Sequence, residues 1–307
     1  MILTDPGFVK AQLPEIPEDA NKFTRGRLLL FCGSYGMAGA AIMAVRAAFR
    51  AGAGFVDLAV PERLYPVVAA AVPEAVITLY DEADTEKLQE TAGRALKKAD
   101  AVVMGCGLGS LRSLVCPAVL RICDRPMVLD ADALNEMALS GLRPLYPEKA
   151  VLTPHEGEMA RLLSMSSADV KADREGSLRK AVSVYHAAAL LKGPGTLILD
   201  REAGRLYQNP TGNAGMARAG SGDVLSGIIG AFLAQGMDGF HAAVSGAYVH
   251  GLAGDIAVAR FGRRSMLPTD LIECIPEALG RIEGTEGSGI RVALSRKKYE
   301  KQKGDIR

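Results

Sequence analysis

Buried strands that alternate with helices constrain this chain more than any other feature of its sequence. The apolar run at 27–32 predicts a buried strand, and a glycine-rich turn at 33–39 and an alanine-rich helix at 40–51 lead to a second strand at 55–60. This order is one βαβ unit. Further strands are expected at 75–80, 100–104, 127–130, 150–153 and 188–191, and further helices at 62–71, 85–98, 114–123, from 158, and 174–186. The alternation predicts an α/β fold in which helices cover both faces of a mainly parallel central sheet.

The end of the chain departs from this order. Residues 196–200 and 204–208 are expected to form a hairpin. The helices expected after it lie at about 224–236, 241–261 and 267–280. Three prolines within 1–25 predict an irregular leader, and a crowd of lysines and arginines predicts a solvated basic tail over 281–307. Since no proline- or serine-rich linker and no repeat interrupts the chain, we expect a single domain over residues 1–307.

Composition argues against several classes of partner. The formal net charge is +1 over 307 residues, so we expect binding neither to nucleic acid nor to a membrane. No run approaches the roughly 18 apolar residues of a membrane span, and the first residues lack the basic and then apolar pattern of a signal peptide. The five cysteines form no Cys-x-x-Cys pair and lie mostly in apolar surroundings, which indicates free thiols in a reducing cytoplasm.

Small or polar residues follow the carboxyl end of several predicted strands. These loops lie at 33–39, 105–109, 130–135, 153–158 and 192–195. Open parallel sheets bind ligands at this edge. We therefore expect the loops to form one crevice, together with a longer loop at 209–223.

The loop at 209–223 is rich in glycine, asparagine and small side chains, and it leads directly into an apolar helix. Gly220 and Gly222 allow the backbone to turn so that the first N–H groups of that helix face an anion, which the helix dipole also favours. Asp223 lies at the rim of this site. The alternative is that Asp223 only caps the helix, but the length of the loop favours an anion site that carries a carboxylate.

A second candidate anion site is the segment Lys192-Gly193-Pro194-Gly195-Thr196, which follows another strand. Lys192 supplies a positive charge, and the glycines let backbone N–H groups approach a phosphate. The alternative is an ordinary turn with a surface lysine.

Several familiar motifs are absent from the sequence. It contains no Gly-Lys P-loop, no Rossmann fingerprint and no Gly-x-Ser-x-Gly. Its histidines do not have metal-ligand spacing, so we assign no direct metal ligand.

The chain contains six motifs in one order: Gly33-Ser-Tyr-Gly-Met-Ala-Gly-Ala-Ala41, Gly105-x-Gly-Leu-Gly109, Asp130-Ala-Asp-Ala-Leu-Asn135, Thr153-Pro-His-Glu-Gly-Glu-Met159, Lys192-Gly-Pro-Gly-Thr196 and Gly220-Ser-Gly-Asp-Val-Leu225. In this combination, over about residues 25–280, the chain resembles the ADP-dependent NAD(P)H-hydrate dehydratases. The resemblance implies a ribokinase-like three-layer αβα sandwich. It also implies a lyase that restores NADH or NADPH from the hydrated forms, NAD(P)HX, by phosphorylating the ring hydroxyl and then releasing phosphate. ADP, or ATP in some members, is the phosphoryl donor.

The resemblance also assigns site residues. The AMP part of the nucleotide would lie against Lys192, Gly193, Pro194, Gly195, Thr196, Gly220, Ser221 and Gly222. The hydrated dinucleotide would contact Ala40, Gly107, Gly109, His155 and Asp223. Asp223 would accept the proton of the substrate hydroxyl, whereas His155 has the alternative role of organising its loop. Mg²⁺ is expected with the nucleotide, with Asp130 and Asp132 organising a loop or contacting the ion through water.

The sequence departs from the family pattern in the loop before the apolar helix. Ser221 stands where many members have threonine, and Arg218-Ala219 replaces a smaller pair. The resemblance further implies a homotetramer. Some members carry an N-terminal epimerase domain, and because the motifs begin early in this chain, we expect a separate protein to supply that activity.

Two other functions fit part of the same pattern. A small-molecule kinase of the ribokinase-like superfamily, acting on a vitamin precursor or a sugar, would share the Gly-Ser-Gly-Asp motif but would release a stable phosphorylated product. A non-catalytic nucleotide sensor would need the anion site without the base. The sequence does not distinguish ADP from ATP, or NADHX from NADPHX.

Overall fold

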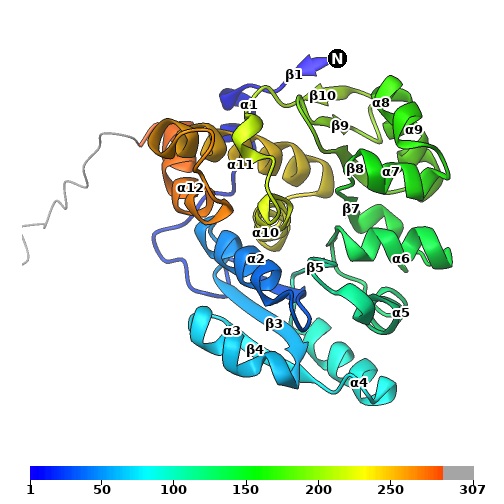
Figure 1. The fold of residues 1–307 in the computed structure, drawn as a ribbon. Coiled ribbons are helices and arrows are strands. Elements are labelled where there is room, and N and C mark those ends of the chain that lie inside the picture. The colour runs from blue at the N-terminus through cyan, green and yellow to red at the C-terminus, as the bar shows by residue number, and fades with distance from the viewer. Residues whose placement is uncertain (286–307) are drawn as a thin grey trace, which may run out of the picture.

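In the computed structural model, which describes residues 1–285, a ten-stranded sheet runs through the molecule in the order β1-β10-β9-β8-β7-β6-β5-β2-β3-β4 (Figure 1). The strands are β1 (Ile2–Leu3), β2 (Arg27–Phe31), β3 (Phe55–Pro61), β4 (Val76–Tyr80), β5 (Ala101–Met104), β6 (Met127–Leu129), β7 (Ala150–Leu152), β8 (Ala188–Leu191), β9 (Leu197–Leu199) and β10 (Leu206–Gln208). All pairs from β8 to β4 are parallel, whereas β9 is antiparallel to both β8 and β10. The mainly parallel sheet and the hairpin are therefore confirmed.

Helices cover both faces of this sheet. They are α1 (Pro6–Gln12), α2 (Ala38–Arg50), α3 (Tyr65–Ala71), α4 (Thr85–Leu96), α5 (Arg112–Leu120), α6 (Asp132–Ser140), α7 (Glu156–Leu163), α8 (Ser167–Ala172), α9 (Arg174–Tyr185), α10 (Ser221–Ala234), α11 (Gly239–Phe261) and α12 (Pro268–Glu283). Alternation along β2 shows the two layers: Leu28 and Leu30 pack with α2 and α10 to α12, while Leu29 and Phe31 pack with α4 to α9. This is the expected αβα sandwich.

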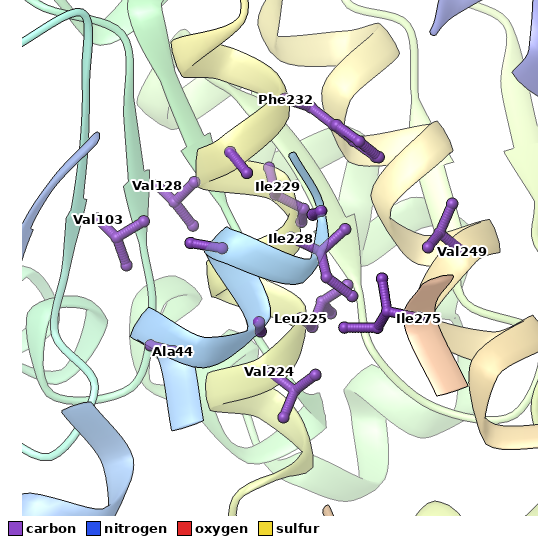
Figure 2. Packing of buried hydrophobic residues seen from close by; sticks show 14 of the residues in the cluster. Ala44, Val103, Val128, Val224, Leu225, Ile228, Ile229, Phe232, Val249 and Ile275 are labelled. Atoms are coloured by element: carbon purple, nitrogen blue, oxygen red, sulfur yellow. The ribbon is translucent and has the colours of Figure 1, made fainter. Parts of the chain in front are cut away.

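The helix α10 lies at the centre of one layer, between α2 and α11 (Figure 1). Its apolar side chains are buried almost all around the helix because it has neighbours on every side. Figure 2 shows Ile228 and Ile229 of α10 among Ala44 of α2, Val128 of β6 and Val249 of α11. The middle of α10 is thus packed between the sheet, α2 and α11, and this packing positions the helix whose first turn carries Asp223.

The prediction of an irregular leader over 1–25 is wrong in its first half. β1 pairs in parallel with β10, and α1 follows. Asp5 caps α1 by accepting a hydrogen bond from the backbone N–H of Phe8 (2.9 Å), and proline occupies its first turn. The ring of Phe8 lies 5.4 Å from that of Tyr207 in β10. A long-range apolar contact therefore stabilises a segment whose local sequence gives a weak signal.

Two boundaries and one helix also differ from the predictions. Residues 130–135 were expected to form a loop, but α6 begins at Asp132 directly after β6, through a sharp turn at Ala131 (φ 48°). The short helix α8, capped by Ser166, was not predicted. The basic tail expected from 281 begins later, because α12 continues to Glu283, and its remainder after 285 lies outside the described residues. The single domain over 1–307 stays a prediction.

By length and composition, α11 is the one helix within residues 1–285 that could cross a membrane. However, 72% of its most apolar window is buried inside the protein, where it packs against α10 and α12. A core helix passes the same test of length and composition, so burial against neighbouring helices accounts for its apolar sequence.

Candidate active site

A cavity of about 1120 Å³ opens at the carboxyl edge of the sheet. It is lined by the loop before α10, the turn after β8, the start of α7 and one face of α11. All eight predicted nucleotide-binding residues line it together: Lys192, Gly193, Pro194, Gly195, Thr196, Gly220, Ser221 and Gly222. Asp223 and His155 line it as well. The structure therefore brings together the two candidate anion sites, which are separated by some 25 residues in the sequence.

Helix α10 begins at this cavity. Gly220 is its N-cap residue and has a φ of 100°, which a residue with a side chain rarely adopts. No side chain caps this end. The backbone N–H of Ser221 donates to the carbonyl oxygen of Arg218 (3.2 Å), so the next two N–H groups, those of Gly222 and Asp223, keep their capacity to bind an anion. The hydroxyl oxygen of Ser221 is buried and has no hydrogen-bond partner within the described chain. An unsatisfied buried hydroxyl at a helix N-terminus is a suitable contact for a ligand oxygen.

Asp223 is not the helix cap, which contradicts the capping alternative. It lies three residues after Gly220, in the first turn of α10, and is half-buried at the cavity. Burial, together with the nearby charge of Asp130, raises its pKa to about 6, although a hydrogen bond with Cys106 and the charge of Lys192 act in the opposite direction. A carboxylate with such a pKa is well matched to accepting a proton near neutral pH.

Lys192 is not a surface lysine. Its ammonium group lies 2.7 Å from Oδ1 of Asp130 and 3.5 Å from Oε2 of Glu158, and only 18% of the side chain is exposed. Burial opposes its charge, but Asp130 and Glu158 outweigh burial and raise its pKa. Asp130 is buried and also accepts a hydrogen bond from Oγ of Ser226 in α10 (2.8 Å). Asp130 therefore connects the turn after β8 to the helix that carries Asp223.

The turn after Lys192 is held from outside by Arg174 of α9. The guanidinium group of Arg174 donates hydrogen bonds to the carbonyl oxygens of Leu191 (3.1 Å) and Pro194 (3.1 Å). Within the turn, the hydroxyl of Thr196 donates to the carbonyl oxygen of Gly193 (3.0 Å). These carbonyl groups are thus engaged by the protein, and the shape of the turn is fixed before any ligand binds.

His155 organises its loop, as the alternative reading of its motif proposed. It is the N-cap of α7, and its Nδ1 accepts hydrogen bonds from the backbone N–H groups of Gly157 (3.0 Å) and Glu158 (3.3 Å). Because Nδ1 accepts, the ring proton lies on Nε2, which is 3.3 Å from Oε1 of Glu158. The ring is about half exposed toward the cavity. Capping leaves its exposed side open to a substrate, so the two roles are compatible.

Ala40, Gly107 and Gly109 lie beside this cavity rather than in its wall. A Cβ on Gly107 would lie 2.8 Å from the Cβ of Ala40, so these two predicted contacts are neighbours. The backbone N–H of Gly109 donates to Oδ2 of Asp132 (2.7 Å). Cys106, next to Gly107, is one of the residues that lower the pKa of Asp223. Gly107 and Gly109 follow β5, which β6 and β7 separate from β8 in the sheet, so these predicted dinucleotide contacts lie apart from the turn after β8.

Three residues with structural roles at this site were not singled out from the sequence. Glu158 pairs with Lys192, as described above. Asp255 of α11 accepts hydrogen bonds from the N–H of Gly212 (2.9 Å) and Nδ2 of Asn213 (2.8 Å), and so fixes the loop before α10. His250 of α11 lies in the cavity wall. Asp255 and His250 lie in α11, well after the last motif in the sequence. The apolar pattern of this helix does not indicate that it contacts the loop before α10.

The departures at 218 and 219 leave the anion site intact. The guanidinium group of Arg218 donates to the carbonyl oxygen of Arg264, so this side chain is engaged near the rim of the cavity.

Among residues 1–285 there is no group of three histidine, cysteine, aspartate or glutamate residues that could hold a metal ion. A protein-only metal site is thus not found in the part of the chain that the structure describes.

Fold and site together define the class of protein. The chain has the ribokinase-like fold, as in a ribokinase-like superfamily protein of Enterococcus faecalis with a TM-score of 0.80 and 28% identity, over 92% of this chain and 96% of that one. The sequence matches the NAD(P)H-hydrate dehydratase family over residues 28–277, and the chain belongs to this family.

Individual relatives agree with the family match. The chain is 41% identical over 248 residues to the ADP-dependent (S)-NAD(P)H-hydrate dehydratase of Neisseria meningitidis, covering 78% of this chain and 79% of that protein. It is 38% identical over 303 residues to the bifunctional NAD(P)H-hydrate repair enzyme Nnr of Moorella thermoacetica, covering 96% of this chain and 57% of that protein. It therefore spans about half the length of the bifunctional relatives.

A solved structure gives the same result. The ADP/ATP-dependent NAD(P)H-hydrate dehydratase of Bacillus subtilis, co-crystallised with ATP/Mg²⁺, aligns with a TM-score of 0.80 and 28% identity over 92% of this chain and 99% of that one.

Proposed function

We propose that this protein dehydrates NAD(P)HX to NAD(P)H with ADP, or ATP, as phosphoryl donor. Transfer of the terminal phosphoryl group of ADP to the ring hydroxyl leaves AMP, and departure of phosphate with loss of a ring proton then forms the double bond. The observation that carries the proposal is the position of Asp223. It is a half-buried carboxylate beside the uncapped N-terminus of α10, in a cavity shared with the turn after β8.

The geometry divides the work between two groups of residues. Asp223 accepts the proton of the substrate hydroxyl as that oxygen attacks the phosphoryl group. The backbone N–H groups at the start of α10 stabilise the negative charge on the transferred group. Lys192, held by Asp130 and Glu158, adds a fixed positive charge close to Gly222, whose Cβ position lies 3.6 Å from the ammonium nitrogen. The nucleoside part then extends along the turn after β8.

Mg²⁺ fits this site as a companion of the nucleotide. Magnesium in phosphoryl-transfer sites is held mainly by phosphate oxygens and water, with one or two carboxylates. The oxygens of Asp130 already bind Lys192 and Ser226, which disfavours direct ligation by Asp130. Asp132 uses one oxygen for Gly109 and keeps the other for water around the ion. When bound, Mg²⁺ would offset the charge of the phosphates.

Incubation with NADHX tests the proposal. Protein, NADHX, ADP and Mg²⁺ are mixed, and the absorbance of NADH is followed, with ATP in a parallel reaction and with nucleotide omitted as control. Nucleotide-dependent formation of NADH is expected. No NADH with either nucleotide would refute the dehydratase. A stable phosphorylated product from a vitamin precursor or a sugar, supplied in place of NADHX, would then establish the kinase instead.

We further propose a reducing cytoplasmic location, a homotetramer, and an epimerase that interconverts the hydrate forms in the same pathway. The five cysteines all lie within the described residues, are buried and are free thiols, which supports a reducing compartment. Exposed apolar side chains such as those of Leu139 and Tyr146 support the homotetramer, because contact with another subunit would bury them. Light scattering during gel filtration measures the assembly, and a monomeric mass would contradict the tetramer.

A further inference from the structure

His250 presents a polar side chain to the cavity from α11. This helix contributes three residues to the wall, Ala247, His250 and Gly251, and only the histidine has a polar side chain. Nε2 of His250 lies 2.9 Å from the carbonyl oxygen of Ser221, the first residue of α10. The imidazole therefore connects α11 to the helix end that forms the anion site.

This hydrogen bond fixes the tautomer of the ring. A carbonyl oxygen only accepts, so Nε2 carries the proton and Nδ1 keeps a lone pair. Nδ1 has no hydrogen-bond partner among the residues that the structure describes. Burial, and to a smaller extent the charge of Lys192, lowers the pKa of His250 to about 4 despite the bond to Ser221, so the ring is neutral at physiological pH. Nδ1 is thus an unsatisfied acceptor in the cavity wall.

An acceptor here differs from the rest of the anion site, which consists of donors: the N–H groups of α10 and the ammonium group of Lys192. A phosphate oxygen repels the lone pair of Nδ1, whereas a neutral O–H or N–H group complements it. In a nucleoside diphosphate such donors occur only on the nucleoside part, as ribose hydroxyls and as the exocyclic amino group of adenine.

We propose that His250 is a nucleotide-specificity residue: Nδ1 accepts a hydrogen bond from a ribose hydroxyl or from the adenine amino group, while Nε2 holds the first carbonyl group of α10. The inference rests on the proposed use of ADP. It adds a residue of α11 to a nucleotide site otherwise built from the turn after β8 and the loop before α10.

Two substitutions separate the two ring nitrogens. His250→Gln places an amide nitrogen near the position of Nε2, so it keeps a donor for Ser221 and removes the acceptor at Nδ1. His250→Asn places its amide oxygen near Nδ1 and loses the bond to Ser221. The affinity of each protein for ADP, 2′-deoxy-ADP, 3′-deoxy-ADP and inosine diphosphate is measured by titration calorimetry, without NADHX and with thermal unfolding as a check on folding.

The wild type is expected to bind one of the three analogues about 3- to 10-fold more weakly than ADP, the effect of one lost hydrogen bond. His250→Gln should weaken the binding of ADP by a similar factor and should bind ADP and that analogue with equal affinity. His250→Asn should keep the preference for ADP over that analogue. Equal weakening of all four nucleotides in His250→Gln would overturn the inference alone. Equal affinity of the wild type for ADP and every analogue would also overturn the inference, and this result does not depend on whether His250→Gln folds. A wild type that binds no nucleotide would overturn the proposed function as well.

Discussion

Asp223 combines two properties that burial produces together. Its carboxylate is poorly solvated and lies near Asp130, which raises its pKa to about 6. The same environment makes it a better base than an exposed aspartate. Asp223→Asn keeps the shape of the side chain and removes the base, so turnover of NADHX should fall about 10²- to 10⁴-fold, while ADP affinity stays within a few-fold. Steady-state kinetics and calorimetry measure the two effects, and undiminished turnover would remove Asp223 from catalysis.

The raised pKa of Asp223 also predicts a cost in stability. A carboxyl group whose pKa is higher in the folded than in the unfolded state destabilises the folded protein when it is ionised, that is, at a pH above its folded pKa. At a pH below its unfolded pKa the group is protonated in both states and does not affect stability. The rise from 3.8 to about 6 corresponds to at most about 3 kcal/mol. Asp223→Asn should therefore raise the melting temperature at pH 8, and the difference should vanish below about pH 4. An equal difference at both pH values would contradict this reason.

At the residue scale, the sequence motifs predicted which side chains lie at the same edge of the sheet. Lys192 and Asp223 meet in one cavity because Lys192 follows β8 and Asp223 lies in the first turn of α10, at the same sheet edge. The sequence could not show that Asp130 and Glu158 hold Lys192, since these partners come from the turn after β6 and from α7 and meet only in the folded protein. His250 was missed for the same reason.

At the scale of elements, the close approach of α2 and α10 depends on a residue without a side chain. A Cβ on Gly227 would lie 2.2 Å from the carbonyl oxygen of Ala44, so the two helices would have to separate. Gly227→Ala should destabilise the protein by at least about 2 kcal/mol. Denaturant unfolding measures this change, and a free energy of unfolding equal to that of the wild type would contradict the packing argument.

A matched control lies in α4. Gly93 is also inside a helix, but its Cβ would lie 4.0 Å from the nearest atom, on Ile122. Because alanine has a higher helix propensity than glycine, Gly93→Ala should stabilise the protein by up to about 1 kcal/mol. Opposite signs at the two glycines would separate packing from propensity. Stabilisation by both substitutions would mean that α2 and α10 can move apart at little cost.

Strong periodicity made most elements predictable, and weak local signals account for the misses. The apolar run of β2 and the regularly spaced apolar residues of α10 were recognised from the sequence because each element buries a continuous apolar surface. By contrast, β1 has two exposed residues and is defined only by pairing with β10. The start of α6 was missed because the Asp130 to Asn135 motif reads as a polar loop, although its backbone already turns into a helix at Asp132.

At the scale of the whole molecule, the cavity joins elements that are distant in the chain. One side is the turn after β8, and the other is the N-terminus of α10, which packs in the opposite helical layer from α7 and α9. A nucleotide that spans both sides would bind only the folded protein. Its binding must then stabilise the fold as a whole, by about 2.7 kcal/mol when its concentration is 100 times its Kd.

ADP with Mg²⁺ should therefore raise the melting temperature by about 5 °C at that concentration, with inorganic phosphate as the control ligand. Gly222→Ala provides a matched variant. Its Cβ would lie 3.6 Å from both Asp130 and Lys192, an ordinary contact, and alanine has the higher helix propensity, so the free protein should melt at or slightly above the melting temperature of the wild type. The added methyl group occupies the space beside the first N–H groups of α10, so the ADP-dependent rise should be lost. A rise of the same size in this variant would place the phosphates elsewhere in the cavity.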